Sequence, residues 1–318
     1  MTDFTTLPDL ASRLFGGGVV HADDEFFAAA DHLVLPSAPT FTPRTFDHKG
    51  QVYDGWETRR RRSPGSDSVV VRLGAPGVIR GVVVDTAFFT GNFPPYASLD
   101  GAVGDDWVPL VPKSPLRGDT RNLFEVSDER RFTRVRLTIH PDGGVARLRV
   151  HGEVVGDPAL LPGEFDVAAV EHGGRVVDCS DMFYGHPESM LMPGLPQHMG
   201  DGWETARRRD DGNDWVIVRL GAPAVLTFAD LDTTHFKGNA PGAARLLGSA
   251  GGQDWFELLP RTPLHPDTRH RFPLPAERPA DHVRLDIYPD GGMARLRLLG
   301  RPDRRVLEER FRRHVEAR

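Results

Sequence analysis

Strict alternation of apolar and polar residues marks the most regular parts of this chain. Val135, Leu137 and Ile139 alternate with polar residues, and the same pattern returns at Val283-Arg-Leu-Asp-Ile287. A period of two is typical of a strand that buries one face. Pro-Asp-Gly-Gly follows each segment, and a second alternating segment follows that loop. Each unit is therefore expected to be an antiparallel hairpin, with glycine supplying positive φ in the turn.

Val-rich runs of strand length supply further expected strands. They lie at Ser68 to Leu73, Val78 to Val84, Trp215 to Leu220 and Val225 to Leu231, and Gly-Ala-Pro ends the first run of each pair. Many short strands between turn signals, with almost no long helical period, favour an all-β fold. The prediction is two tandem homologous jelly-roll or β-sandwich domains.

Helix is expected mainly at the edges of these domains. A short helical turn is predicted from Asp24 to Ala30, because a carboxylate can cap the exposed N–H groups of a first turn. A short C-terminal helix is predicted from Asp303 onward. There Leu307 and the apolar residues four and eight positions later form one stripe among arginines and glutamates.

An internal duplication organises the whole sequence. Asp54-Gly-Trp-Glu-Thr-Arg-Arg-Arg-Arg62 returns 147 residues later as Asp201-Gly-Trp-Glu-Thr-Ala-Arg-Arg-Arg209. A period this long indicates duplicated domains and not a solenoid. The expected boundaries are 1–152 for the first repeat, 153–165 for a linker, 166–301 for the second repeat and 302–318 for the helix. Towards the N-terminus the shift grows to 157, so the first copy carries about ten extra residues around Val34 to Gly50.

Composition narrows the class of protein. A chain of 318 residues has the length of about two ordinary domains. The net charge of −6 and a pI near 6.1 argue against a nucleic-acid partner, and no apolar run is long enough to span a membrane. The single cysteine, Cys179, excludes an internal disulfide and a Cys-based zinc site, so a reducing cytoplasm is the expected location. No His-x-His or His-Glu-x-x-His pattern predicts a metal site, and helix capping explains the carboxylates after His21.

Gly-Trp-Glu-Thr followed by arginines occurs in both copies, and chance does not explain such a recurrence. Arginine presents a planar fork to carboxylates or ureido oxygens, while the neighbouring glutamate can orient an arginine or move a proton. The candidates for substrate binding in this motif are Glu57, Arg59, Arg61, Arg207, Arg208 and Arg209, and Glu204 is a candidate for catalysis. The alternative is a buried Trp with a structural Glu–Arg network that the fold itself requires.

Asp-Thr-x-x-Phe-x-Gly-Asn is the second repeated signature. Its second copy has His235 and Lys237 where the first has Phe88 and Thr90, and phenylalanine cannot transfer a proton. The second repeat is therefore the expected catalytic one. Its candidates are Glu204, Asp232, His235 and Lys237 for catalysis, with Asn239 for substrate binding. An ordinary loop histidine is the alternative for His235, and the Pro-Asp-Gly-Gly motif is assigned to structure.

Together these signatures, with Asn213-Asp-Trp215 and Arg-Leu-Gly, resemble the allantoicase family over nearly the whole chain. The resemblance implies two tandem jelly-roll domains and the hydrolysis of allantoate to (S)-ureidoglycolate and urea in purine breakdown. It also makes a homo-oligomer the expected assembly. No cofactor is expected, and a divalent metal such as Mn²⁺ is left open. The sequence departs from a doubled pattern at Phe88 and at Asp67-Ser68, where the second copy has Asp214-Trp215, so equivalent sites in both repeats are not expected.

Allantoate carries two ureido groups and a carboxylate on one carbon, so its hydrolysis needs a carboxylate clamp, an acid for the departing urea and a base for water. Arginines among Arg207 to Arg209 are expected to provide the clamp. Either His235 or Glu204 would serve as acid and base, while Asp232 and Asn239 would orient ureido groups. Two alternatives to the enzyme are a pair of ligand- or carbohydrate-binding modules and a structural pseudoenzyme.

Overall fold

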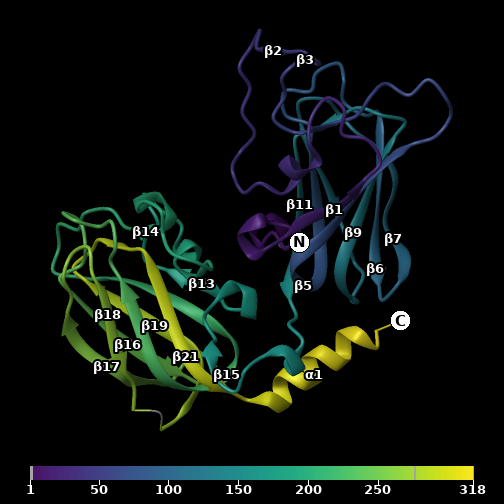
Figure 1. The fold of residues 1–318 in the computed structure, drawn as a ribbon. Helices are drawn as coiled ribbons and strands as arrows, with labels where there is room; N and C mark the ends of the chain where they lie inside the picture. Colours follow the sequence, from purple (N-terminus) through teal and green to yellow (C-terminus); the bar gives the residue numbers. More distant parts are fainter. Residues whose placement is uncertain (1–2, 276, 318) are drawn as a thin grey trace. The chain divides into compact units, whose positions relative to one another are not determined.

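The computed structural model describes residues 3–275 and 277–317 and contains two compact units. One holds the chain up to Val155 together with the last residues from Arg312, and the other holds Gly156–Phe311. Both are built mainly from antiparallel strands, and the one α-helix of the described residues is α1 (Arg304–Val315) (Figure 1). The predicted all-β fold with a short C-terminal helix is confirmed. No helix of the described residues is long and apolar enough to cross a membrane.

Eleven strands and three short 3-10 helices form the first unit. The strands are β1 (Gly18–Ala22), β2 (Phe46–Asp47), β3 (Gly50–Gln51), β4 (Trp56–Glu57), β5 (Asp67–Asp85), β6 (Tyr96–Val103), β7 (Asp106–Pro115), β8 (Arg121–Glu125), β9 (Arg131–His140), β10 (Gly144–Val145) and β11 (Arg147–Val154). The 3-10 helices are η1 (Phe4–Thr6), η2 (Arg13–Phe15) and η3 (Ala30–Val34).

The second unit repeats this order without counterparts of β2 and β3, and it adds the short strand β12 and one more 3-10 helix. Its strands are β12 (Phe165–Asp166), β13 (Arg175–Cys179), β14 (Trp203–Glu204), β15 (Asp214–Asp232), β16 (Ala243–Ser249), β17 (Trp255–Pro263), β18 (Arg269–Pro273), β19 (Pro279–Tyr288), β20 (Gly292–Met293) and β21 (Arg295–Pro302). Its 3-10 helices are η4 (Pro158–Leu160), η5 (Val170–His172), η6 (Pro187–Leu191) and η7 (Met199–Asp201).

One long strand joins the two layers of each unit. The first part of β5 pairs with β1 and β9, and its last part pairs with β11 and β8. The register with β9 shifts between Arg72 and Gly77, at the Gly-Ala-Pro motif, because proline has no N–H to donate to a ladder. The same shift occurs in β15 between Arg219 and Ala224. The sequence predicted two strands in each of these places, which was wrong: Gly-Ala-Pro marks where one strand passes between layers.

The hairpin predicted around Pro-Asp-Gly-Gly is also wrong. β9 pairs with β5 and β6, whereas β11 pairs with the other half of β5, so the loop connects strands of different layers. In the second unit β19 and β21 are related in the same way. Alternation shows which residues of a strand are buried, but it does not show which neighbour the strand pairs with.

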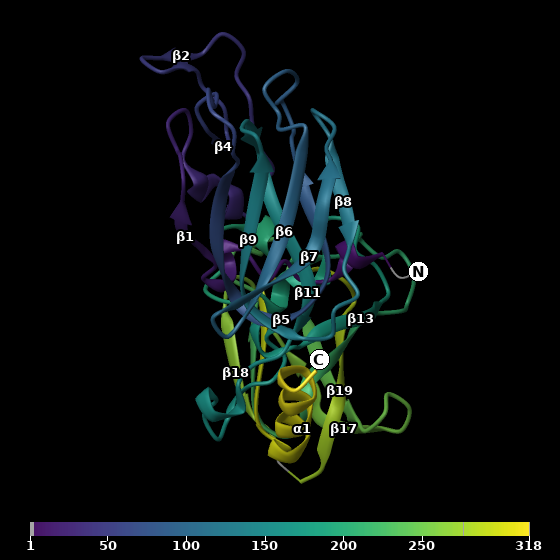
Figure 2. The same ribbon diagram turned by 90° about the vertical axis from the view of Figure 1, so that its right-hand side faces the viewer.

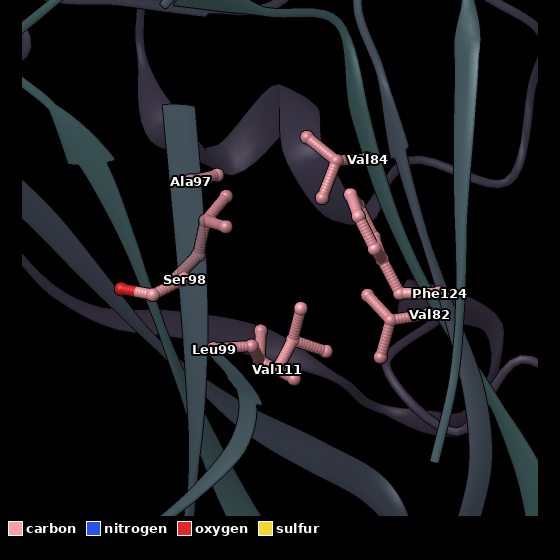
Figure 3. A pocket seen from close by; sticks show the side chains of 8 residues that line it. Val82, Val84, Ala97, Ser98, Leu99, Val111 and Phe124 are labelled. Atoms are coloured by element: carbon pink, nitrogen blue, oxygen red, sulfur yellow. The ribbon is translucent and has the colours of Figure 1, made fainter. Parts of the chain in front are cut away.

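The core of the first unit lies between its two layers. Val82, Val84 and Phe124 face Ala97, Leu99 and Val111 across a small hollow (Figure 3). The lining is almost entirely apolar, and the hydroxyl of Ser98 points away from it toward His140, 3.1 Å distant. This hollow therefore belongs to the packing of the core and offers no polar groups to a ligand.

The segment before β4 differs between the units, as predicted. η3 ends 22 residues before Trp56, and η6 ends 12 residues before Trp203, so the first unit has ten more residues here. They carry β2 and β3, which lie beyond the ends of the long strands (Figures 1 and 2). The helical turn predicted from Asp24 is wrong, because the helical residues begin only at Ala30. Asp24 accepts the backbone N–H of Phe26 at 3.0 Å in an irregular loop.

Candidate functional site

Three repeated motifs meet at one end of each unit. β4, which contains the Trp-Glu of the first motif, pairs with β10, which contains the last glycine of Pro-Asp-Gly-Gly. Glu57 lies opposite Gly144, and in the second unit Glu204 lies opposite Gly292. The loop that follows the long strand supplies the third motif.

A buried phenylalanine holds these motifs together. A Cβ on Gly144 would lie 2.0 Å from the ring of Phe89, and a Cβ on Gly292 would lie 1.9 Å from the ring of Phe236. Both rings are fully buried. Any side chain at these glycines would displace the ring, so the last glycine of Pro-Asp-Gly-Gly is required by close packing and not only by a turn.

A hydrogen-bonded glutamate and asparagine lie where the motifs meet. Asn92 Nδ2 donates to Glu57 Oε1 at 2.7 Å, and Asn239 Nδ2 donates to Glu204 Oε1 at 2.6 Å. The backbone carbonyl of each asparagine also accepts the N–H of the glycine opposite the glutamate, at 2.7 and 2.8 Å. The asparagine is therefore fixed on both sides and can hold the carboxyl group in one orientation.

The tryptophan of the first motif anchors a neighbouring loop. Trp56 Nε1 donates to the carbonyl of Asp24 at 2.7 Å, and Trp203 Nε1 donates to that of Asp181 at 2.8 Å. The Asp24 carboxylate accepts the backbone N–H of Arg59, and that of Asp181 accepts the N–H of Ala206. These carboxylates hold the loop against the Glu-bearing strand. Within residues 3–275 and 277–317 no group of three or more His, Cys, Asp and Glu is arranged to hold a metal ion.

The arginines after this motif divide into two groups. Arg208 Nη1 lies 2.5 Å from the buried Asp214, and Arg61 forms the matching ion pair with Asp67. Arg59 is held by Asp24, 2.7 Å from its Nε. Arg207 and Arg209 are exposed and have no hydrogen bond or ion pair with any described residue. The structure therefore leaves Arg207 and Arg209 available to a ligand, while the other three are engaged.

The remaining candidates of the second repeat lie on the loop after β15. Asp232 is buried and accepts the N–H of Thr234 at 2.8 Å, so it shapes the start of the loop. His235 Nε2 lies 3.1 Å from the carbonyl oxygen of Pro196, and the exposed Lys237 Nζ lies 3.9 Å from Asp267. The printed contacts join Glu204 to Asn239 but do not join Glu204 to His235.

Both copies of this loop hold a non-glycine residue in the left-handed conformation. The φ angle is 68° at Phe88 and 73° at His235. The N–H of Phe88 donates to Asp119 and the N–H of His235 donates to Asp267, each at 2.8 Å. This conformation costs roughly 1–2 kcal/mol for a residue with a side chain. Backbone strain of this kind is concentrated at functional sites, and here it occurs at the position where the two repeats differ.

Burial affects the acidity of the first glutamate. It raises the pKa of Glu57 above its usual value, and the hydrogen bond from Asn92 acts in the opposite direction, because it stabilises the carboxylate. A carboxyl group with such a pKa can keep its proton at a higher pH than a free glutamate.

Sequence reasoning missed Asn92 and the two buried phenylalanines. Their signal was present, since all three lie in a signature that recurs at a fixed shift. The sequence alone could not show what this signature does, because its partner motif lies far away in the chain. Glu57 and Asn92, which form the contact, are 35 residues apart.

Fold and site together define a protein of two tandem jelly-roll repeats, each with a polar Glu–Asn pair at the junction of its repeated motifs. The model of the allantoicase repeat matches residues 8–155 and again residues 165–303. The chain belongs to the allantoicase family. It is 60% identical over 312 residues to a probable allantoicase of Nocardia farcinica, covering 93% of this chain and 95% of the relative. A probable allantoicase of Pseudomonas aeruginosa is 45% identical over 317 residues, covering 92% and 96%.

Solved structures agree with these sequence relatives. The crystal structure of allantoicase from Saccharomyces cerevisiae superposes with a TM-score of 0.80 at 35% sequence identity, covering 93% of each chain. A second structure, described as that of allantoicase, superposes with a TM-score of 0.77, covering 92% of each chain. The likeness extends over both repeats.

Proposed function

We propose that this protein is an allantoicase, a hydrolase of carbon–nitrogen bonds in linear amidines that converts allantoate to (S)-ureidoglycolate and urea in allantoin degradation. The observation that carries the proposal is membership of the allantoicase family over both repeats. The site is consistent with it, because each repeat keeps the Glu–Asn pair with nearly the same hydrogen-bond length.

The second repeat is the proposed place of the reaction. Glu204 is held by Asn239 through one carboxyl oxygen, so its other oxygen is free to take a proton from water or to give one to the departing urea. His235 is the second candidate for proton transfer, and Lys237 lies on the same loop. Asp232 supports this loop through its hydrogen bond to Thr234, which makes it a positioning residue.

The substrate carboxylate needs a cation that has no protein partner. Arg207 and Arg209 fulfil this condition, whereas Arg208 is engaged by Asp214. Arg207 and Arg209 are therefore the proposed carboxylate clamp, since a guanidinium can hold a carboxylate through two parallel hydrogen bonds. Glu57, Arg59 and Arg61 remain proposals for substrate binding in the first repeat, although both arginines have carboxylate partners there.

The decisive experiment measures urea and ureidoglycolate released from allantoate by the purified protein. It is repeated after chelation and again after Mn²⁺ is restored. Release of both products in equal amounts is expected. Activity that survives chelation supports acid–base chemistry by side chains alone, whereas activity that returns only with Mn²⁺ directs attention to His and carboxylate ligands.

A pair of non-catalytic binding modules is the alternative function. It predicts that the protein binds allantoate without releasing urea under any of these conditions. A homo-oligomer and a cytoplasmic location are proposed from the sequence, and sedimentation of the purified protein together with fractionation of cells would test them.

A further inference from the structure

A column of four aromatic rings lies beside the Glu–Asn pair of the first repeat. Phe88 stacks on Phe41 at 5.6 Å, Phe41 on Tyr53 at 5.2 Å, and Tyr53 on Phe89 at 4.7 Å, with interplanar angles of 21°, 23° and 22°. Phe41 and Tyr53 come from the segment between η3 and β4, which is ten residues longer than its counterpart. This longer segment therefore contributes directly to the surroundings of the site.

A buried ion pair fixes the two rings from this segment. Arg147 is 1% exposed and lies 2.8 Å from the Asp54 carboxylate, and its Nε donates to the carbonyl of Ser37 at 3.0 Å. The same carboxylate accepts the N–H of Thr40 at 2.9 Å. The Thr40 hydroxyl donates to it as well, at 3.2 Å. Thr40 precedes Phe41 and Asp54 follows Tyr53, so these two hydrogen bonds set the two rings beside each other.

The column and the glutamate occupy the same face of β4. Glu57 lies opposite Gly144 in the β4–β10 ladder, and directly opposed residues of an antiparallel pair project to the same side. Phe89, the last ring of the column, covers this side, because a Cβ on Gly144 would lie 2.0 Å from its ring. Glu57 is therefore the next side chain along the surface that the column occupies, and its Oε2 has no hydrogen bond to a described residue.

The second repeat has the same Glu–Asn pair without this wall. Gly200 stands in place of Tyr53 and His235 in place of Phe88. His198 stands in place of Phe41, because the N–H of the preceding Gln197 donates to Asp201 as that of Thr40 does to Asp54. Its asparagine contacts the sulfur of Met199 at 3.7 Å instead.

We propose that the first repeat contains a second ligand site, in which Glu57 and Asn92 bind a planar ureido group and the rings of Phe88, Phe41 and Tyr53, packed on the buried Phe89, form the apolar wall. The inference rests on the proposed function for the chemistry of the ligand. A ureido group presents N–H donors to a carboxylate and a carbonyl to an N–H donor, and its planar faces suit an aromatic wall. Phe88 is 39% exposed, so the end of the column is open to a ligand.

Two further features agree with a binding site. Phe88 is a bulky residue at positive φ, a conformation that a merely structural surface phenylalanine would avoid. Burial also raises the pKa of the Glu57 carboxyl group, because its charged form lacks solvation that an N–H donor of a ligand would replace. The first repeat would thus bind the ligand without His235 or Lys237, the side chains available for proton transfer in the second repeat.

The test is a calorimetric titration of the full chain with N-carbamoylglycine, which has one ureido group and one carboxylate. The titration is made with the Glu204→Gln variant, so that binding at the second repeat contributes little to the measured heat. Phe41→Ala and Glu57→Gln are then introduced separately, with Phe46→Ala as the matched control. Phe46 is on the same longer segment, is 68% exposed and lies outside the column.

We expect Phe41→Ala to weaken binding by roughly three- to tenfold, the loss of one aromatic stacking contact. Glu57→Gln should weaken it at least as much, and Phe46→Ala should have no effect. Glu57→Gln removes a charge but little volume, so it tests the site even if Phe41→Ala loosens the segment. Equal affinities in all three variants would overturn the inference.

Allantoate hydrolysis by the wild-type protein separates this inference from the proposed function. If the protein releases urea but replacement of Phe41 and replacement of Glu57 both leave ligand binding unchanged, the second site is refuted and the proposed function stands. Absence of urea release refutes the proposed function, and the titration still decides whether the first repeat binds a ureido group.

Discussion

Glu204 and Asn239 are joined by a hydrogen bond of 2.6 Å between Oε1 and Nδ2. The asparagine comes 35 residues after the glutamate, and the same separation and contact recur between Glu57 and Asn92. One carboxyl oxygen is therefore fixed in both repeats. Whatever the glutamate does to a ligand, it does with the other oxygen.

The first prediction concerns proton transfer in the second repeat. The double variant Glu204→Gln, His235→Ala should lose roughly 10²–10⁴-fold in kcat, the usual contribution of a positioned acid or base. The two single variants show which of the residues carries the effect. Urea release from allantoate is the measurement, and full activity of the double variant would remove both residues from the mechanism.

Arg207 and Arg208 are adjacent in sequence, yet their replacement should have different effects. Arg207→Ala should raise KM by about tenfold or more with unchanged thermal stability, because its guanidinium has no partner among the described residues. Arg208→Ala should instead lower the free energy of unfolding by roughly 1–3 kcal/mol, because it leaves the buried Asp214 without its cation. Steady-state kinetics and thermal unfolding of the two variants distinguish the roles. Similar effects of both on KM would contradict the division of the arginines.

Glycine packing provides a third prediction. Gly292→Ala should destabilise the protein by about 1–3 kcal/mol and reduce activity, since its Cβ would lie 1.9 Å from the Phe236 ring and would push the loop bearing Asn239 away from Glu204. Gly238→Ala is the control, because a Cβ there has no atom within 4 Å. Denaturant titration and urea release measure the two effects. A stable, active Gly292→Ala protein would show that the ring can move without consequence.

The fourth prediction concerns pH and stability at Glu188. Burial raises the pKa of this carboxyl group to about 7, and its Oε1 has no hydrogen-bond partner among the described residues. The unfolded chain releases the proton at a lower pH than the folded chain, so stability falls as the pH rises from about 4.5 to 7 and then levels off. Glu188→Gln should remove this loss and add up to about 3 kcal/mol above pH 7, with little effect below pH 4.5.

Denaturant titrations of Glu188→Gln at both ends of this pH range are the measurement. Glu308→Gln, an exposed position on α1, is the control and should follow the wild type throughout. A Glu188→Gln protein that has the stability of the wild type at pH 8 would show that the carboxyl group ionises without cost.

The sequence predicted much of this fold, because duplication and alternation are local signals. The all-β class, the strands β9, β11, β19 and β21, the C-terminal helix and the ten additional residues of the first copy follow from them. Strand pairing cannot be predicted from these signals. The alternation of buried and exposed residues is the same whether a strand pairs with the next segment or with one further along the chain. For this reason Pro-Asp-Gly-Gly was interpreted as a hairpin turn, whereas Gly144 in fact supports Phe89 between two layers.

The sequence predicted residues of the candidate site, but it did not predict the contacts among them. Repetition alone singled out Glu204, Asn239 and the arginines. It could not show that Asn239 holds Glu204, nor that Arg208 is engaged by Asp214, because both facts depend on residues brought together by the fold. Phe41 stands where the second copy has His198, so repetition gave no signal for it.

The passage of β5 and β15 through both layers of their units has a mechanical consequence. Secreted β-sandwiches of the immunoglobulin type often tie their two sheets with a disulfide, which a chain with one cysteine cannot form internally. Here the continuous backbone of one strand is the covalent link between the layers. Its first part is hydrogen-bonded in one layer and its last part in the other, so pulling the layers apart breaks hydrogen bonds of that strand. Each repeat should therefore open as one cooperative body, with the amide hydrogens of its two sheets exchanging with solvent together.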